Sequence, residues 1–203
     1  MSAEIPGADR ALLARARDGE RAAREQLAQR VGRSAYVFAL QITGAPDAAR
    51  DVAQDGVLRF FQHLDRFDSS RPLDPWLYQI VRNRARDLMR RERVRRHESL
   101  DAWLEQGHPE AADPAADPAA DAERHDLQRR VWRAISQLPE DHREIFVLRD
   151  YHDLSYREIA EVLEIPQGTV MSRLHAARKG LREILLDEGN PAAEGPSGRR
   201  GDQ

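Results

Sequence analysis

The chain has 203 residues, a formal net charge of −3 at pH 7, and a composition that is 40% hydrophobic, 33% charged and 6% aromatic. Such a length accommodates one domain or two small ones, and the low aromatic content favours helical bundles over a β-sandwich. The absence of cysteine excludes a disulfide framework, a thiolate zinc site and a cysteine nucleophile.

Four helices are expected in the first half of the chain. Asp9 is a candidate N-cap for a short helix that stops near residues 18–19. A longer helix ends at Gly44, a third begins near Asp47, and a fourth begins at Trp76. Apolar residues recur in these segments at three- and four-residue steps, which predicts that one face of each helix is buried.

The helical pattern stops between residues 97 and 125, where the near-repeat Ala-Ala-Asp-Pro offers neither a core-forming face nor a continuous helix. We therefore expect a first helical domain over residues 9–96, a flexible acidic linker over 97–125, a second helical domain over 126–187, and a disordered tail over 188–203. A linker of this length does not require the two domains to touch.

Charge is segregated along the chain although its sum is small. Residues 81–96 contain eight arginines and two acids, whereas residues 98–126 contain nine acids and one arginine. The N-terminal residues lack the basic start and apolar stretch of a signal peptide, and no segment approaches the length of a membrane span. We expect a cytoplasmic protein with no membrane insertion of its own.

The segment from Ser155 to Leu186 has the pattern of a helix-turn-helix. Ser155 and Glu158 form a capping-box motif, the break at residues 164–168 ends the first helix, and a second helix follows. The outward side of that second helix is polar and basic, with Ser172, Arg173, His175, Arg178, Lys179 and Arg182. This surface suits phosphates and base edges; a solvated basic face on an ordinary helical hairpin is the alternative.

The fourth helix has a second basic stripe, formed by Arg82, Arg86, Arg90 and Arg93. The nearby aromatics Phe67, Trp76 and Tyr78 either stack on unpaired bases or belong to the core. A third interpretation is that the arginines steer duplex phosphates by charge alone, without stacking.

Asp51 and Asp55 lie four residues apart, on one helix face. That spacing suits a divalent metal or an acid–base pair, but no third ligand or glycine-rich loop accompanies it, so solvated acids near a helix N-terminus or a partner-binding face are favoured. The histidines lack metal-ligand spacing, and nucleotide-binding and serine-nucleophile motifs are missing from the sequence. We expect no enzyme activity, no metal and no cofactor.

Several motifs in a fixed order resemble bacterial sigma factors of the extracytoplasmic-function type. In the first half they are Asp51-Val-Ala-Gln-Asp55 with Leu58, Leu64-Asp-Arg-Phe67, Trp76-Leu-Tyr-Gln-Ile-Val-Arg-Asn83 and Asp87-Leu-Met-Arg-Arg91. In the second half they are Leu138-Pro-Glu, Arg143-Glu-Ile-Phe-Val-Leu-Arg149, Leu154-Ser-Tyr-Arg-Glu-Ile-Ala160 and Gly168-Thr-Val-x-Ser-Arg-Leu-His175.

This resemblance implies an all-α fold of two small helical domains, called sigma regions 2 and 4, joined by a flexible linker. It implies that core RNA polymerase binds at Asp51, Gln54 and Asp55. It implies that the −10 promoter element binds at Trp76, Arg82, Asn83, Arg86 and Arg90. It implies that the −35 element binds at Thr169, Ser172, Arg173, His175, Arg178 and Lys179.

The partners implied by the resemblance are core RNA polymerase, promoter DNA and an anti-sigma factor. The alternative function is that of a stand-alone helix-turn-helix transcriptional regulator. That alternative explains the C-terminal half of the chain but leaves the arginine-rich helix and the Asp51–Asp55 face without a role.

Overall fold

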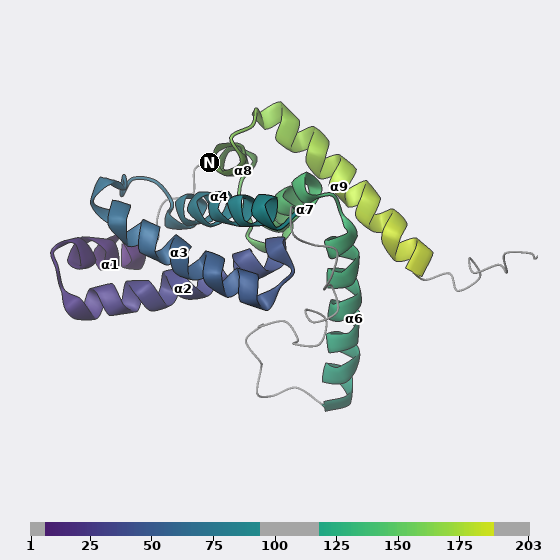
Figure 1. Cartoon of the computed structure of the whole chain (residues 1–203), viewed down its shortest axis with the longest axis horizontal. Helices are drawn as coiled ribbons and strands as arrows, with labels where there is room; N and C mark the ends of the chain where they lie inside the picture. The colour runs from purple at the N-terminus through teal and green to yellow at the C-terminus, as the bar shows by residue number, and fades with distance from the viewer. Residues whose placement is uncertain (1–6, 94–117, 189–203) are drawn as a thin grey trace, which may run out of the picture.

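A computed structural model describes residues 7–93 and 118–188, and the elements within these ranges are all helical (Figure 1). The first helical group contains α1 (Gly7–Arg17), α2 (Arg21–Thr43), α3 (Pro46–His63), the 3-10 helix η1 (Leu64–Arg66) and α4 (Leu73–Arg93). The second helical group contains α6 (Pro118–Gln137), α7 (Glu140–Phe146), the π-helical turn η2 (Val147–Tyr151), α8 (Tyr156–Leu163) and α9 (Gln167–Glu188). The all-α prediction is confirmed.

The core of the first group lies where α2, α3 and α4 pack together. Phe38, Phe60 and Leu77 are among its fully buried side chains, and each contributes about 1.5–3 kcal/mol relative to an exposed position. Gly56 permits the close approach of α3 to α4, since a Cβ atom there would lie 3.0 Å from a methyl group of Val81. The hydrophobic periodicity of the sequence therefore located this core.

Two of the expected helix starts are wrong by a few residues. Asp9 lies in the first turn of α1, which begins at Gly7, and is not its N-cap. The fourth helix begins at Leu73 and not at Trp76, because proline is tolerated in the first turn, where its missing N–H has no helical acceptor. The end of α2 is as expected: Gly44 follows it with φ of 67°, a left-handed conformation that favours glycine.

The helix-turn-helix of the second group has the predicted form. The Ser155 hydroxyl accepts a hydrogen bond from the Glu158 N–H, and the Glu158 carboxylate accepts one from the Ser155 N–H, which completes the capping box at the start of α8. Glu164 then adopts φ of 56° and ends α8. Ile159, Val162 and Leu174 are buried between these helices and the rest of the group.

The expected linker is partly helical. α6 begins at Pro118, so residues 118–125, which were expected to be linker, extend the first helix of the second group. Proline suits the first helical position and alanine has the highest helix propensity, which explains this early start. Residues 94–117 and the tail at 189–203 lie outside the described residues.

The two groups are packed against each other. α4 contacts α8, and α2 contacts both α7 and η2, so the groups lie side by side in Figure 1. The sequence did not require the two domains to touch, and the described helices of the two groups pack together. Within the described residues, no helix is long and apolar enough to cross a membrane.

Candidate nucleic-acid interface

α9 presents the polar surface that the sequence predicted. Val170, Leu174, Ala177 and Leu181 are buried along one side of the helix. On the other side the predicted residues Ser172, His175, Arg178 and Lys179 are exposed, while Thr169 and Arg173 are half-buried. Five hydrogen-bonding residue types are therefore grouped within residues 169–179 of one helix.

Two of the arginines on α9 are paired with acids from other elements. Arg173 Nη1 lies 3.2 Å from Asp141 Oδ2, on α7, and Arg178 Nη2 donates to Asp150 Oδ1, on η2, at 2.7 Å. The sequence showed no acid within α9 before Glu183. It did not reveal Asp141 and Asp150 as partners because they come from segments more than 20 residues away.

The predicted basic stripe of α4 is divided by the structure. Arg82 is 5% exposed, and its Nε donates to Glu144 Oε2 at 3.0 Å. Arg86 donates to both oxygens of Glu144, each at 2.9 Å, and to Asp141 at 2.7 Å. Asn83 is exposed, as is Arg90. The stripe is therefore partly covered by α7 and partly open to solvent.

Trp76 lies in an aromatic cluster. Its ring is stacked on Phe67, with centroids 4.5 Å apart and an interplanar angle of 19°, and is 4.8 Å from the ring of Phe60. Trp76 is half-buried, whereas Phe67 is buried. Phe67 therefore belongs to the core. Trp76 keeps part of its ring exposed, so base stacking stays open for this residue.

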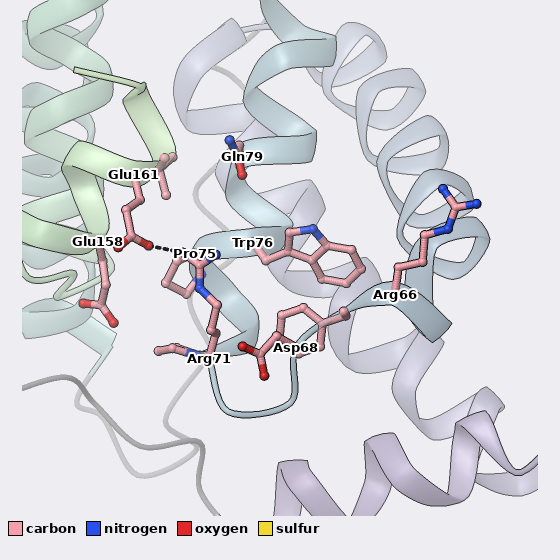
Figure 2. A pocket seen from close by; sticks show the side chains of 11 residues that line it. Arg66, Asp68, Arg71, Pro75, Trp76, Gln79, Glu158 and Glu161 are labelled. Atoms are coloured by element: carbon pink, nitrogen blue, oxygen red, sulfur yellow. Dashed lines mark hydrogen bonds and ion pairs between the residues drawn. The ribbon is translucent and has the colours of Figure 1, made fainter.

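A cleft of about 190 Å³ lies between residues 66–79 and α8 (Figure 2). Arg66, Asp68 and Trp76 line one side, and Glu158 and Glu161 line the other. An ion pair between Arg71 and Glu161 spans the cleft. The loop that precedes α4 therefore faces the helix-turn-helix of the second group.

Comparisons with known proteins agree with this arrangement. Residues 27–104 match the family described as Sigma-70 region 2, and residues 128–181 match the family described as Sigma-70, region 4. The ECF RNA polymerase sigma factor SigL of Mycobacterium tuberculosis is 34% identical over 154 residues, which are 75% of this chain and 82% of SigL. This chain belongs to the ECF sigma factors, where ECF denotes extracytoplasmic function.

Further relatives place the sigma factor in the same family. SigW of Bacillus subtilis, also an ECF RNA polymerase sigma factor, is 28% identical over 155 residues, which cover 75% of this chain and 83% of SigW. The structure of CnrH in complex with the cytosolic domain of CnrY has a TM-score of 0.63 and 31% identity, and the match covers 90% of this chain and 99% of CnrH. RpoE of Bartonella quintana, solved with the anti-sigma factor NepR, has a TM-score of 0.62 and 25% identity over 80% of this chain and 96% of RpoE. The protein is thus a sigma factor, which directs RNA polymerase to promoters.

The predicted polymerase-binding residues of the sigma factor lie on α3. Asp51 and Gln54 are exposed, and the neighbouring Leu58 is a large apolar side chain with 59% exposure. Asp55 is half-buried, and its Oδ2 accepts from Arg84 Nε at 2.5 Å, which joins α3 to α4. Among the described residues, no group of three or more His, Cys, Asp or Glu side chains is arranged to hold a metal ion.

A largely buried polar chain, not predicted from the sequence, connects the two helical groups of the sigma factor; Gln41 and Tyr78 are buried and His152 is half-buried. Tyr78 Oη lies 2.9 Å from His152 Nδ1, and His152 Nε2 lies 2.7 Å from Gln41 Oε1. Burial lowers the pKa of His152 to about 4 and raises the pKa of Tyr78. The imidazole is therefore neutral near pH 7, with Nε2–H donating to Gln41 and Nδ1 accepting from Tyr78.

Proposed function

We propose that α9 is the helix by which this sigma factor recognises the −35 promoter element. The observation that supports this is the exposed, hydrogen-bonding surface of α9 on a helix whose opposite side is buried. In helix-turn-helix proteins the N-terminal residues of the second helix contact base edges in the major groove. The proposed contacts are Thr169, Ser172, Arg173, His175, Arg178 and Lys179.

The proposed −10 site is formed by α4 and the loop before it. Arginine side chains and an accessible aromatic ring are the groups that bind an unpaired strand, through phosphate pairing and base stacking. The proposed contacts are Trp76, Arg82, Asn83, Arg86 and Arg90. Asn83 and Arg90 are accessible in the structure as it stands.

The exposed face of α3 is the proposed docking site for core RNA polymerase. Asp51 and Gln54 provide polar contacts, and the exposed Leu58 provides apolar area at their side. Asp55 contributes to this proposed site partly by holding the Arg84 side chain against α3. Under this proposal, the chain has no catalytic activity of its own.

An anti-sigma protein is a further proposed partner. This proposal is supported by RpoE of Bartonella quintana, whose structure was solved with the anti-sigma factor NepR. We place the protein in the cytoplasm, where it meets core RNA polymerase and promoter DNA.

Run-off transcription with purified core RNA polymerase on genomic templates tests this function. We expect discrete transcripts that depend on the sigma factor, and weaker binding of core polymerase by Asp51→Asn. Glu25→Gln is the matched control, because it removes the same charge from an exposed side chain on α2, outside the proposed docking face. Failure to bind core polymerase or to support any start site would contradict the proposal.

A further inference from the structure

The acidic edge of α7 contacts arginines from both proposed DNA-binding surfaces. We name Glu140, Asp141 and Glu144 the α7 acid cluster. Asp141 Oδ1 accepts from Arg86, on α4, at 2.7 Å, while Asp141 Oδ2 lies 3.2 Å from Arg173, on α9. One carboxylate therefore bridges an arginine of the proposed −10 site and an arginine of the proposed −35 site.

Glu144 is the most buried member of the α7 acid cluster. Its side chain is 1% exposed, and its two oxygens accept three hydrogen bonds, one from Arg82 and two from Arg86. Guanidinium groups bind carboxylates and phosphates with the same planar geometry. Glu144 and Asp141 therefore occupy positions on Arg82 and Arg86 that strand phosphates would otherwise take.

Docking of the second helical group also closes the route to these arginines. The Arg82 guanidinium donates to the Val162 carbonyl oxygen of α8 at 3.4 Å, and Arg82 is 5% exposed. On the same side of the molecule, the ion pair between Arg71 and Glu161 spans the cleft beside Trp76 (Figure 2). A DNA strand reaches Arg82 only after α7 and α8 withdraw from α4.

We propose that the α7 acid cluster holds the free sigma factor in a closed form, in which it competes with promoter DNA for the arginines of α4 and α9. This inference rests on the proposed function, since it takes those arginines to be the DNA contacts. Opening exchanges carboxylates for phosphates on the same guanidinium groups. The interface suits such an exchange because interfaces between domains of one chain are commonly polar and reversible.

The first experiment measures the separation of the two groups. The chain has no cysteine, so spin labels on Gln62→Cys and Leu186→Cys, both at exposed positions, report a single distance distribution. We expect Asp141→Asn combined with Glu144→Gln to shift the distribution to longer distances. The control combines Glu25→Gln with Asp47→Asn, which removes the same charge from exposed side chains and leaves the distribution unchanged.

The second experiment measures binding of a fluorescein-labelled single-stranded DNA of random sequence to the full chain. The double variant is expected to bind on the order of tenfold more tightly than the wild type, because apparent affinity scales with the fraction of molecules in the binding-competent form. Adding Arg86→Ala to the double variant should remove most of that gain. If the double variant loses helical content by circular dichroism, Asp141→Asn alone replaces it, since that side chain is 47% exposed.

The outcomes separate this inference from the proposed function. An unchanged label distance overturns the closed form, whatever the DNA result. A longer distance without tighter DNA binding overturns the competition with DNA. Run-off transcription with Arg86→Ala in the wild-type background tests the −10 assignment independently: normal transcription there contradicts the proposed function and leaves the measured opening as it stands.

Discussion

Arg173 and Arg178 lie on the solvent side of α9, but each guanidinium group contacts a carboxylate of the α7–η2 segment. The carboxylates orient the two arginines before DNA arrives, and they also have to be displaced if the arginines turn toward a base. The free energy that each arginine contributes to DNA binding is therefore a difference. It is the free energy of the arginine–guanine contact minus that of the ion pair that is lost at a partly exposed site.

Replacing either arginine with alanine should weaken promoter binding. We expect Arg173→Ala and Arg178→Ala each to cost about 1–3 kcal/mol where the arginine contacts a guanine. Binding of the polymerase holoenzyme to duplex promoter DNA measures this cost. Arg21→Ala is the control, because that side chain is 92% exposed and lies on α2; full promoter affinity in both α9 variants would place the recognition surface elsewhere.

The protonation of His152 affects the free energy of unfolding of the packed groups. Burial lowers its pKa to about 4, from 6.5 in the unfolded chain. Below pH 6.5 the unfolded chain takes up a proton at this imidazole that the folded chain does not, so the free energy of unfolding falls as pH falls from 6.5 toward 4. Between pH 7 and pH 5 we expect His152 to account for a loss of about 2 kcal/mol.

Urea unfolding of the wild type and of His152→Gln at the two pH values isolates this contribution. Other titrating groups affect both proteins alike, while glutamine keeps a polar side chain that does not titrate. The wild type should therefore lose more stability on acidification than the variant. Equal losses in the two proteins would show that His152 is not protonated differently in the folded and unfolded chains.

At the scale of single elements, α8 depends on its capping box. Ser155 satisfies the backbone N–H of Glu158, which has no acceptor within the helix. We expect Ser155→Ala to lower the free energy of unfolding by about 1 kcal/mol, as measured by urea denaturation. Ser136→Ala, which removes a hydroxyl that bonds within α6, should change it by less than about 0.5 kcal/mol; a similar loss in both would argue against a capping role.

In α4, helical periodicity predicted which apolar residues are buried but not which arginines are covered. Successive residues are separated by about 100° around a helix, so the buried positions of Leu77, Val81 and Ala85 followed directly from the spacing of apolar residues. The same spacing grouped Arg82 with Arg90. It did not show that Arg82 is covered by α7 and α8 while Arg90 stays exposed, because those helices come from the other end of the chain.

At the scale of the whole molecule, the pair formed by Arg82 and Glu144 joins the two helical groups in a buried position. A buried charge that loses its partner is strongly destabilising, whereas replacing both charges with apolar side chains is often neutral. We expect Glu144→Leu alone, which leaves Arg82 without a carboxylate, to cost up to about 3–5 kcal/mol. Arg82→Met alone should cost less, because Arg86 still pairs with Glu144, and the two together should cost less than Glu144→Leu alone. Urea unfolding of the four proteins of this double-mutant cycle provides the coupling energy.

Opening of the interface limits the loss of unfolding free energy in each single variant. The two groups separate once their separation costs less free energy than keeping an unpaired charge buried. The spin-label distance should therefore lengthen in the single variants and less so in the double variant. Additive losses in the double-mutant cycle would show that Arg82 and Glu144 do not interact in solution.

The sequence by itself determined the helical class, the positions of most helices, the capped helix-turn-helix and the polar surface of α9. These features depend on local propensity, capping and hydrophobic periodicity, which act over a few residues. Its motifs also indicated the sigma-factor family. Only the tertiary structure decided which acid faces which arginine, since Glu144 lies 62 positions from Arg82. It also decided that the two groups pack together, because that packing depends on contacts between segments that local sequence patterns do not encode.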